Sequence, residues 1–379
     1  MPRFSAPKRL TEGLTAAGLL VCALALVRHP REISAAVRQG LELCGTVILP
    51  ALFPFFVLTS LAVSLGLPRL MSRVLEPVMV PLFHLSGSCA APLALGLIGG
   101  YPVGAKAALA LYQSDQCSKS EAERLLAFCN NAGPSFILGV VGAQIFADSR
   151  AGLLLWLTHI AAALCVGLLV RFTPGAEGTD HRRQCPPFSA VSLPTAFTNA
   201  VGDGLHSTLN LCAFVICFTA ILRLCQLTGL ISMPAGLLGL LGLPQQRTEL
   251  LVTGLLELSS GTAALRDVRD LEVRLALAAF FLGWGGLSVH CQTLSLLQDS
   301  GLRCRLCWPG KLLQGLIATG LTVLLYRFFP FSCPAGSWPV SSPPPSMGLD
   351  WVSLAAWGLV LAAALFSVKR TGKRRRGMV

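Results

Sequence analysis

Two short polar stretches interrupt the apolar sequence of this chain and contain residue types from which a buried binding site could be built. Residues 99–106 read GGYPVGAK, and residues 128–137 read FCNNAGPSFI. Paired asparagines, a Gly-Pro step and a lysine are costly in lipid, and they are tolerated where an interrupted helix lines a cavity or a path. The two stretches therefore predict broken helices around a polar cavity.

The first stretch combines backbone freedom with a positive charge. Glycine permits close backbone approach, and proline interrupts a helix because it has no N–H to donate. The N-terminal end of a broken helix favours an anion, and Lys106 could add a positive charge for an anionic substrate. The alternative is that Lys106 extends to the membrane interface. The candidate binding residues here are Gly99, Gly100, Tyr101, Pro102 and Lys106.

The second stretch offers amide groups. An asparagine side chain both donates and accepts hydrogen bonds, which suits a polar heteroaromatic ring or a carboxylate. The alternative is that the two asparagines cap the ends of the broken helix. The candidates here are Asn130, Asn131, Gly133, Pro134 and Ser135.

The second half of the chain contains matching breaks. Glu257 is costly at membrane depth unless it is paired, protonated or bound to an ion, so it is a candidate for coupling to H⁺ or Na⁺. A salt bridge to a neighbouring helix is the alternative. Trp284 could stack on a planar ligand. The candidates in this half are Glu257, Ser259, Ser260, Gly261, Thr262, Trp284 and Ser288.

The catalytic signatures of enzymes are missing from the sequence. It contains no nucleophile–base set, and GGYPVGAK lacks the spacing of a phosphate-binding loop and the Ser or Thr that follows its lysine. The chain has 14 cysteines, and Cys304 and Cys307 form a C-x-x-C without a second pair at zinc-ribbon spacing. We expect no catalytic residues, no metal site and no cofactor apart from a coupling ion.

Composition points to a membrane protein. The chain has 379 residues, of which 53% are hydrophobic and 13% charged, whereas about a quarter are charged in a soluble domain. The net charge of +12 comes from basic residues at segment ends and in the tail 369–376. This pattern fits the excess of Lys and Arg on cytoplasmic loops and argues against nucleic-acid binding. The lipid bilayer is the expected partner.

The apolar blocks predict an all-α polytopic membrane protein with about eight transmembrane helices plus re-entrant or broken helices. Segments around 96–109 and 128–135 are similar to segments around 254–265 and 281–288, at an offset of about 153–158 residues, which indicates two internal repeats. Three crossings per half would make them inverted, and four would make them parallel. Basic residues 171, 182 and 183 favour the inverted arrangement, whereas residues 28, 31 and 38 count against it.

This organisation divides the chain into five parts. Residues 14–27 could be a signal peptide, but many further apolar blocks follow, so we expect an uncleaved first span. The expected parts are an N-terminal helix and connection (1–42), a first repeat (43–171), a polar linker (172–199), a second repeat (200–330) and an extra C-terminal helix with a basic tail (331–379).

At GGYPVGAK and ERLLAFCNNAGPSFILG the sequence resembles the YlbJ-type sporulation integral membrane proteins. These carry paired Gate, or nucleoside-recognition, domains, and they are distantly similar to concentrative nucleoside transporters. The resemblance covers about residues 40–330, with Ala132 at a position where the family motif has serine. It implies a protein of the outer forespore membrane in a spore-forming bacterium, and a role in moving dipicolinate.

Three functions stay open at this point. The first is transport of a small planar anion, with dipicolinate as the leading candidate. The second is transport of a nucleoside-like heteroaromatic solute. The third is a non-transporting membrane scaffold for assembly of the spore envelope, which would need no polar cavity. The sequence does not decide whether the chain self-associates.

Overall fold

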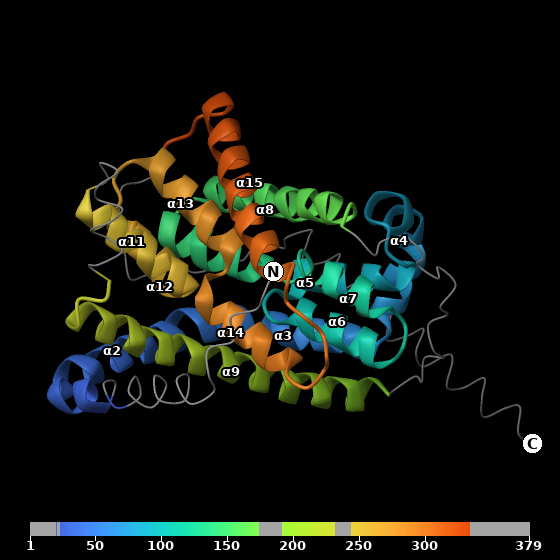
Figure 1. Ribbon diagram of the computed structural model, residues 1–379, viewed down its shortest axis with the longest axis horizontal. Coiled ribbons are helices and arrows are strands. Elements are labelled where there is room, and N and C mark those ends of the chain that lie inside the picture. Colours follow the sequence, from blue (N-terminus) through green and yellow to red (C-terminus); the bar gives the residue numbers. More distant parts are fainter. Residues whose placement is uncertain (1–19, 21–22, 174–191, 232–243, 334–379) are drawn as a thin grey trace, which may run out of the picture.

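The structure is a computed structural model, and it describes residues 20, 23–173, 192–231 and 244–333. The expected first span, the central linker, and the C-terminal helix with its basic tail fall wholly or mainly outside these residues. All regular elements in the described ranges are helical (Figure 1). This part of the chain therefore has the all-α fold that the apolar blocks predict.

The described helices follow one another in two series. The first comprises α2 (Pro30–Leu43), the π-helix η1 (Cys44–Ile48), α3 (Leu49–Ser64), α4 (Leu67–Phe83), the short 3₁₀ turn η2 (Gly87–Cys89), α5 (Ala90–Gly99), α6 (Val103–Gln113), α7 (Lys119–Leu125), the π-helix η3 (Ser135–Phe146) and α8 (Ser149–Val170). The second comprises α9 (Leu193–Leu227), α11 (Gln245–Leu256), α12 (Leu258–Ala264), the 3₁₀ turn η4 (Leu265–Asp267), α13 (Leu271–Trp284), α14 (Gly286–Leu297) and α15 (Cys307–Phe328).

Four helical stretches in these ranges are long and apolar enough to cross a membrane, and there are up to five if the bent pair 74–83 and 87–99 is one span. The chain bends by 104° between these two helices. The described ranges therefore contain several spans and at least one bent segment. The full count of about eight, and the inverted relation of the halves, stay predictions.

The long helix α9 lies along α2 and α3 and forms one layer of the molecule (Figure 1). Small residues permit the close approach. A Cβ on Gly40 would lie 3.2 Å from the Cα of Ile216, and a Cβ on Gly204 would lie 3.0 Å from the backbone N of Val57. Small residues at helix crossings are the usual means of close packing in lipid, where no hydrophobic force drives helices together.

A second group of helices consists of α8, α13 and α15 (Figure 1). The hydroxyls of Thr158 and Thr322 are hydrogen-bonded at 2.8 Å between α8 and α15. Gly283 and Gly315 face each other, since a Cβ on Gly283 would lie 2.5 Å from the Cα of Gly315. The first contact joins α8 to α15, and the second packs the end of α13 against α15.

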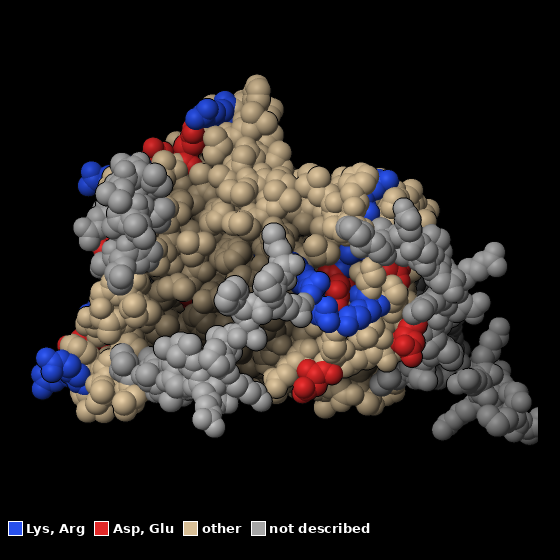
Figure 2. All heavy atoms as spheres, viewed as in Figure 1, with Lys and Arg blue, Asp and Glu red and all other residues tan. Residues whose placement is uncertain are grey.

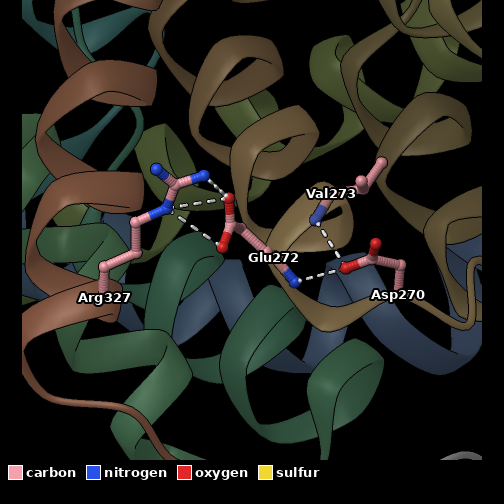
Figure 3. A network of polar contacts seen from close by, with 4 residues as sticks. All are labelled: Asp270, Glu272, Val273 and Arg327. Carbon is pink, nitrogen blue, oxygen red and sulfur yellow. Dashed lines mark hydrogen bonds and ion pairs between the residues drawn. The ribbon is translucent and has the colours of Figure 1, made fainter.

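On the face seen in Figure 2, charged side chains lie at the left and upper edges and in a group right of centre. Asp270 caps α13 by accepting from the N–H groups of Glu272 (3.0 Å) and Val273 (3.2 Å). Glu272 in turn accepts from Arg327 at 2.7 Å, which joins the start of α13 to the end of α15 (Figure 3). Asp270 thus caps the start of α13, and Glu272 pairs with the end of α15.

The breaks expected from sequence coincide with helix ends. In the first half, α5 ends at Gly99 and α6 begins at Val103, while α7 ends at Leu125 and η3 begins at Ser135. In the second half, α11 gives way to α12 at Glu257, and α13 gives way to α14 at Gly285. Helices in the described ranges therefore end and begin at each of the four breaks that the sequence indicates.

Candidate functional site

Within each half, the two breaks touch through glycine. A Cβ on Gly100 would lie 2.8 Å from the backbone N of Gly133, and a Cβ on Gly286 would lie 2.9 Å from the backbone N of Leu258. Gly100 and Gly286 also have positive φ values of 79° and 78°, a backbone region that favours glycine. Both pairs of broken helices therefore meet backbone to backbone.

Tyr101 connects the two halves. Its hydroxyl donates to the carbonyl oxygen of Leu282 at 3.2 Å. A Cβ on Gly285 would lie 2.9 Å from that hydroxyl, so the absence of a side chain there makes room for it. The break at Gly99–Pro102 is thereby held against the break at the end of α13.

A cavity of about 480 Å³, counting the open space at its mouth, lies where these breaks converge. The predicted residues in its wall are Gly99, Gly100, Tyr101, Gly133, Ser135, Glu257, Ser259 and Ser288. The other lining residues are Leu52, Phe56, Ala132, Phe136, Leu211, Val215, Leu258, Val289 and Gln292. The wall is thus mostly apolar with a few polar groups, as is usual for a small-molecule site.

Three helices present their N-terminal ends to this cavity. Ser135 is the first residue of η3, Ser259 is the second of α12, and Ser288 is the third of α14. The N-terminal end of a helix has a partial positive charge and unsatisfied N–H groups, so it favours an anion. At α12 the N-terminal end is already occupied by the side chain of Glu257. This residue is 2% exposed and accepts from the N–H groups of Ser259 (3.0 Å) and Ser260.

Gln292 supplies an unused polar group in the cavity wall. The side chain is 3% exposed, and its Oε1 has no hydrogen-bond partner among the described residues. A buried acceptor without a partner costs about 1–3 kcal/mol. A ligand or water molecule with a donor group would remove that cost.

A polar cluster lies behind Tyr101, away from the lining of the cavity. Lys311, which is 4% exposed, donates from Nζ to the backbone carbonyl of Asn130 (2.7 Å), to Gln314 Oε1 (2.6 Å) and to Asn131 Oδ1 (3.4 Å). Gln314 Nε2 also donates to Asn131 Oδ1 at 2.9 Å. The Lys311 ammonium lies 5.3 Å from the centre of the Tyr101 ring, whose residue lines the cavity.

Both asparagines have partners inside the protein. Asn131 donates from Nδ2 to the carbonyl of Phe128 at 2.7 Å, so it stabilises the end of the preceding helical turns. Asn130 donates to Thr293 Oγ1 at 3.0 Å, which connects the break to α14, while its Oδ1 is buried without a partner. The capping alternative therefore describes part of what Asn131 does.

The remaining predicted residues lie outside the cavity lining. Lys106 is half-buried and donates to Ser207 Oγ at 3.4 Å on α9. Trp284 donates to the carbonyl of Leu255 at 2.9 Å and contacts the His290 ring, so it already has neighbours that hold it in place. Those absent from the wall are Pro102, Lys106, Asn130, Asn131, Pro134, Ser260, Gly261, Thr262 and Trp284.

Reasoning from sequence missed Lys311, Gln314 and Gln292. Lys311 stands in an apolar block beyond the repeated segments, and one lysine in such a block is also typical of a helix end. A signal was available, since Lys311 and Gln314 are three residues apart on one helix face in a segment otherwise rich in leucine and glycine. His159 belongs to the same cluster, because its Nε2 accepts from the backbone N–H of Ala132 at 3.3 Å.

Broken helices that meet at a mostly apolar cavity with a few polar groups, inside an apolar helical protein, define a transporter-like membrane protein. Two solved structures of CNTnw variants, in intermediate states 1 and 3, have TM-scores of 0.52 and 0.53 with this chain at 12% and 14% identity. The alignments cover 85% and 86% of this chain and 86% of each transporter chain. The fold is therefore similar to that of a concentrative nucleoside transporter.

Sequence comparison gives the family. The Gate family model, described as nucleoside recognition, matches residues 46–173. The sporulation integral membrane protein YlbJ of Bacillus subtilis (strain 168) is 32% identical over 337 residues, which cover 83% of this chain and 82% of that protein. The chain belongs to the YlbJ family of sporulation integral membrane proteins and is itself an integral membrane protein.

Proposed function

We propose that this protein is a transporter of a small planar anion, and that dipicolinate is its substrate at the outer forespore membrane. The observation that carries the proposal is the cavity at which the paired breaks of both halves converge. The family membership supports a role in sporulation, and the fold supports solute transport.

The surroundings of the cavity favour an anionic and planar solute. The N-terminal ends of η3 and α14 face it, and Lys311 adds a positive charge behind the Tyr101 ring. Tyr101 and Phe136 offer aromatic surface to a flat ring. Glu257 opposes an anion in part, although its oxygens are engaged by the N–H groups of α12.

Uptake of labelled dipicolinate into proteoliposomes, with and without a proton or sodium gradient, tests the proposal. We expect saturable uptake that excess unlabelled dipicolinate abolishes and excess uridine does not. Competition by uridine instead would favour a nucleoside-like solute. Absence of uptake of both compounds by folded protein would favour the scaffold function.

We expect Gln292→Leu to reduce dipicolinate uptake about tenfold, because leucine removes the side-chain amide from the cavity wall, and the N–H groups of that amide can donate to a carboxylate of the substrate. The measurement is the initial rate of uptake at fixed protein per liposome. Gln298→Leu is the matched control, since Gln298 is exposed at the end of the same helix. Equal rates for Gln292→Leu and wild type would place the substrate elsewhere.

We expect Lys106→Met to keep at least half of the wild-type uptake rate. Lys106 contacts Ser207 on α9 and does not line the cavity, so its loss removes one long hydrogen bond. The same rate measurement checks this. A loss as large as that for Gln292→Leu would restore Lys106 as the group that recognises the anion.

A further inference from the structure

The coordination of the Lys311 ammonium is unusual for a buried charge. Its three acceptors are neutral oxygens, one from the backbone of Asn130 and two from the amides of Asn131 and Gln314. In the part of the chain that the structure describes, no carboxylate lies within ion-pair distance of Nζ. The positive charge is therefore held by carbonyl-type oxygens, with the Tyr101 ring 5.3 Å from Nζ.

A shell of neutral oxygens is how membrane proteins bind monovalent cations. In channels, backbone carbonyls replace the hydration shell of the ion, and in transporters the carbonyls of interrupted helices coordinate the coupling cation. Asn130 resembles both cases. It lies in the non-helical stretch between α7 and η3, and it offers its backbone carbonyl to the Lys311 ammonium. The oxygens around Lys311 thus form a cation site that a side chain occupies.

The site also joins the two halves of the protein. Asn130 and Asn131 come from the break in the first half, while Lys311 and Gln314 come from α15, about 180 residues later. Gln314 Nε2 further contacts the carbonyl of His159 on α8 at 3.5 Å. Because a cation here bridges the two halves, its presence should change the thermal stability of the protein, which is measurable without any transport assay.

We infer that the Lys311 ammonium is a tethered monovalent cation, which fills an oxygen-lined site that would otherwise take a free potassium or sodium ion. The tether makes occupancy permanent, so this position needs no ion from solution in the wild-type protein. Removing the side chain opens the site to a free cation. This inference does not depend on which solute is transported.

Thermal unfolding of purified protein in K⁺, Na⁺ or N-methyl-D-glucamine chloride at equal ionic strength tests it. Lys311→Ala leaves both the oxygens and the space, so we expect its Tm to rise by about 3 °C or more in K⁺ or Na⁺, and to saturate with concentration. Lys311→Met fills the space with an apolar chain and should show no such rise. Wild type and Lys106→Ala should be insensitive to the choice of cation.

Three results would overturn the inference. One is a folded Lys311→Ala protein whose Tm is the same in all three salts. Another is an equal cation response in Lys311→Met, which would move the ion to a different place. The third is aggregation of Lys311→Ala in every salt, since a free cation would then fail to replace the ammonium.

Discussion

Gly96→Ala is expected to remove most folded protein from the membrane. A Cβ at this position would lie 1.7 Å from the carbonyl oxygen of Cys129, and a Cβ on Gly104 would lie 2.1 Å from the same oxygen. All of these contacts involve backbone, so no side chain can move aside. We expect the free energy of unfolding to fall by about 3 kcal/mol or more.

Size-exclusion profiles and Tm values of the detergent-purified protein measure this effect. Gly139→Ala is the control, because a Cβ on Gly139 would meet no atom within 4 Å and alanine is the better helix former. A Gly96→Ala protein with wild-type yield and Tm would contradict the close packing of α5 and α6 against the Cys129 backbone, which precedes the break between α7 and η3.

Asn131→Ala is expected to lower dipicolinate uptake at least tenfold. Asn131 is fully buried and accepts from both Lys311 and Gln314, so its loss leaves two donors short of an acceptor behind the cavity. It also frees the carbonyl of Phe128. Each unsatisfied group costs about 1–3 kcal/mol, and the break that lines the cavity should move in response.

Uptake rates normalised to folded protein check this expectation. Asn199→Ala on the exposed face of α9 is the control, and it should leave the rate unchanged. If Asn131→Ala transported dipicolinate at the wild-type rate, the cluster behind Tyr101 would have no part in transport.

The local chemistry of the sequence predicted the breaks well, because glycine, proline and capping residues act on their own backbone. Gly100, Glu257 and Gly286 all stand at helix ends, as their residue types indicate. Those effects need no knowledge of distant neighbours. The same reasoning selected Tyr101, Ser135 and Ser288 as candidate binding residues because they stand at the breaks, and all three line the cavity.

Long-range pairing was beyond the reach of sequence. Lys106 lies next to the first break in sequence, yet its ammonium contacts α9. The lysine that contacts a break is Lys311, which binds the carbonyl of Asn130 in the second break from about 180 residues further on. Glu257 was considered as an ion-coupling group, and the geometry shows a carboxylate that caps α12. The coupling ion, H⁺ or Na⁺, stays a prediction.

The two formal charges nearest the cavity have opposite signs, with Glu257 in its wall and Lys311 behind one aromatic ring. Counted as ionised, these two charges sum to zero, so under the proposed function this pair would add no net charge to that of the bound solute. Each elementary charge that crosses 100 mV changes the free energy by about 2.3 kcal/mol. Under the proposed transport, a dianion that crosses alone would involve about 4.6 kcal/mol of electrical work per 100 mV, so membrane voltage would drive or oppose that transport.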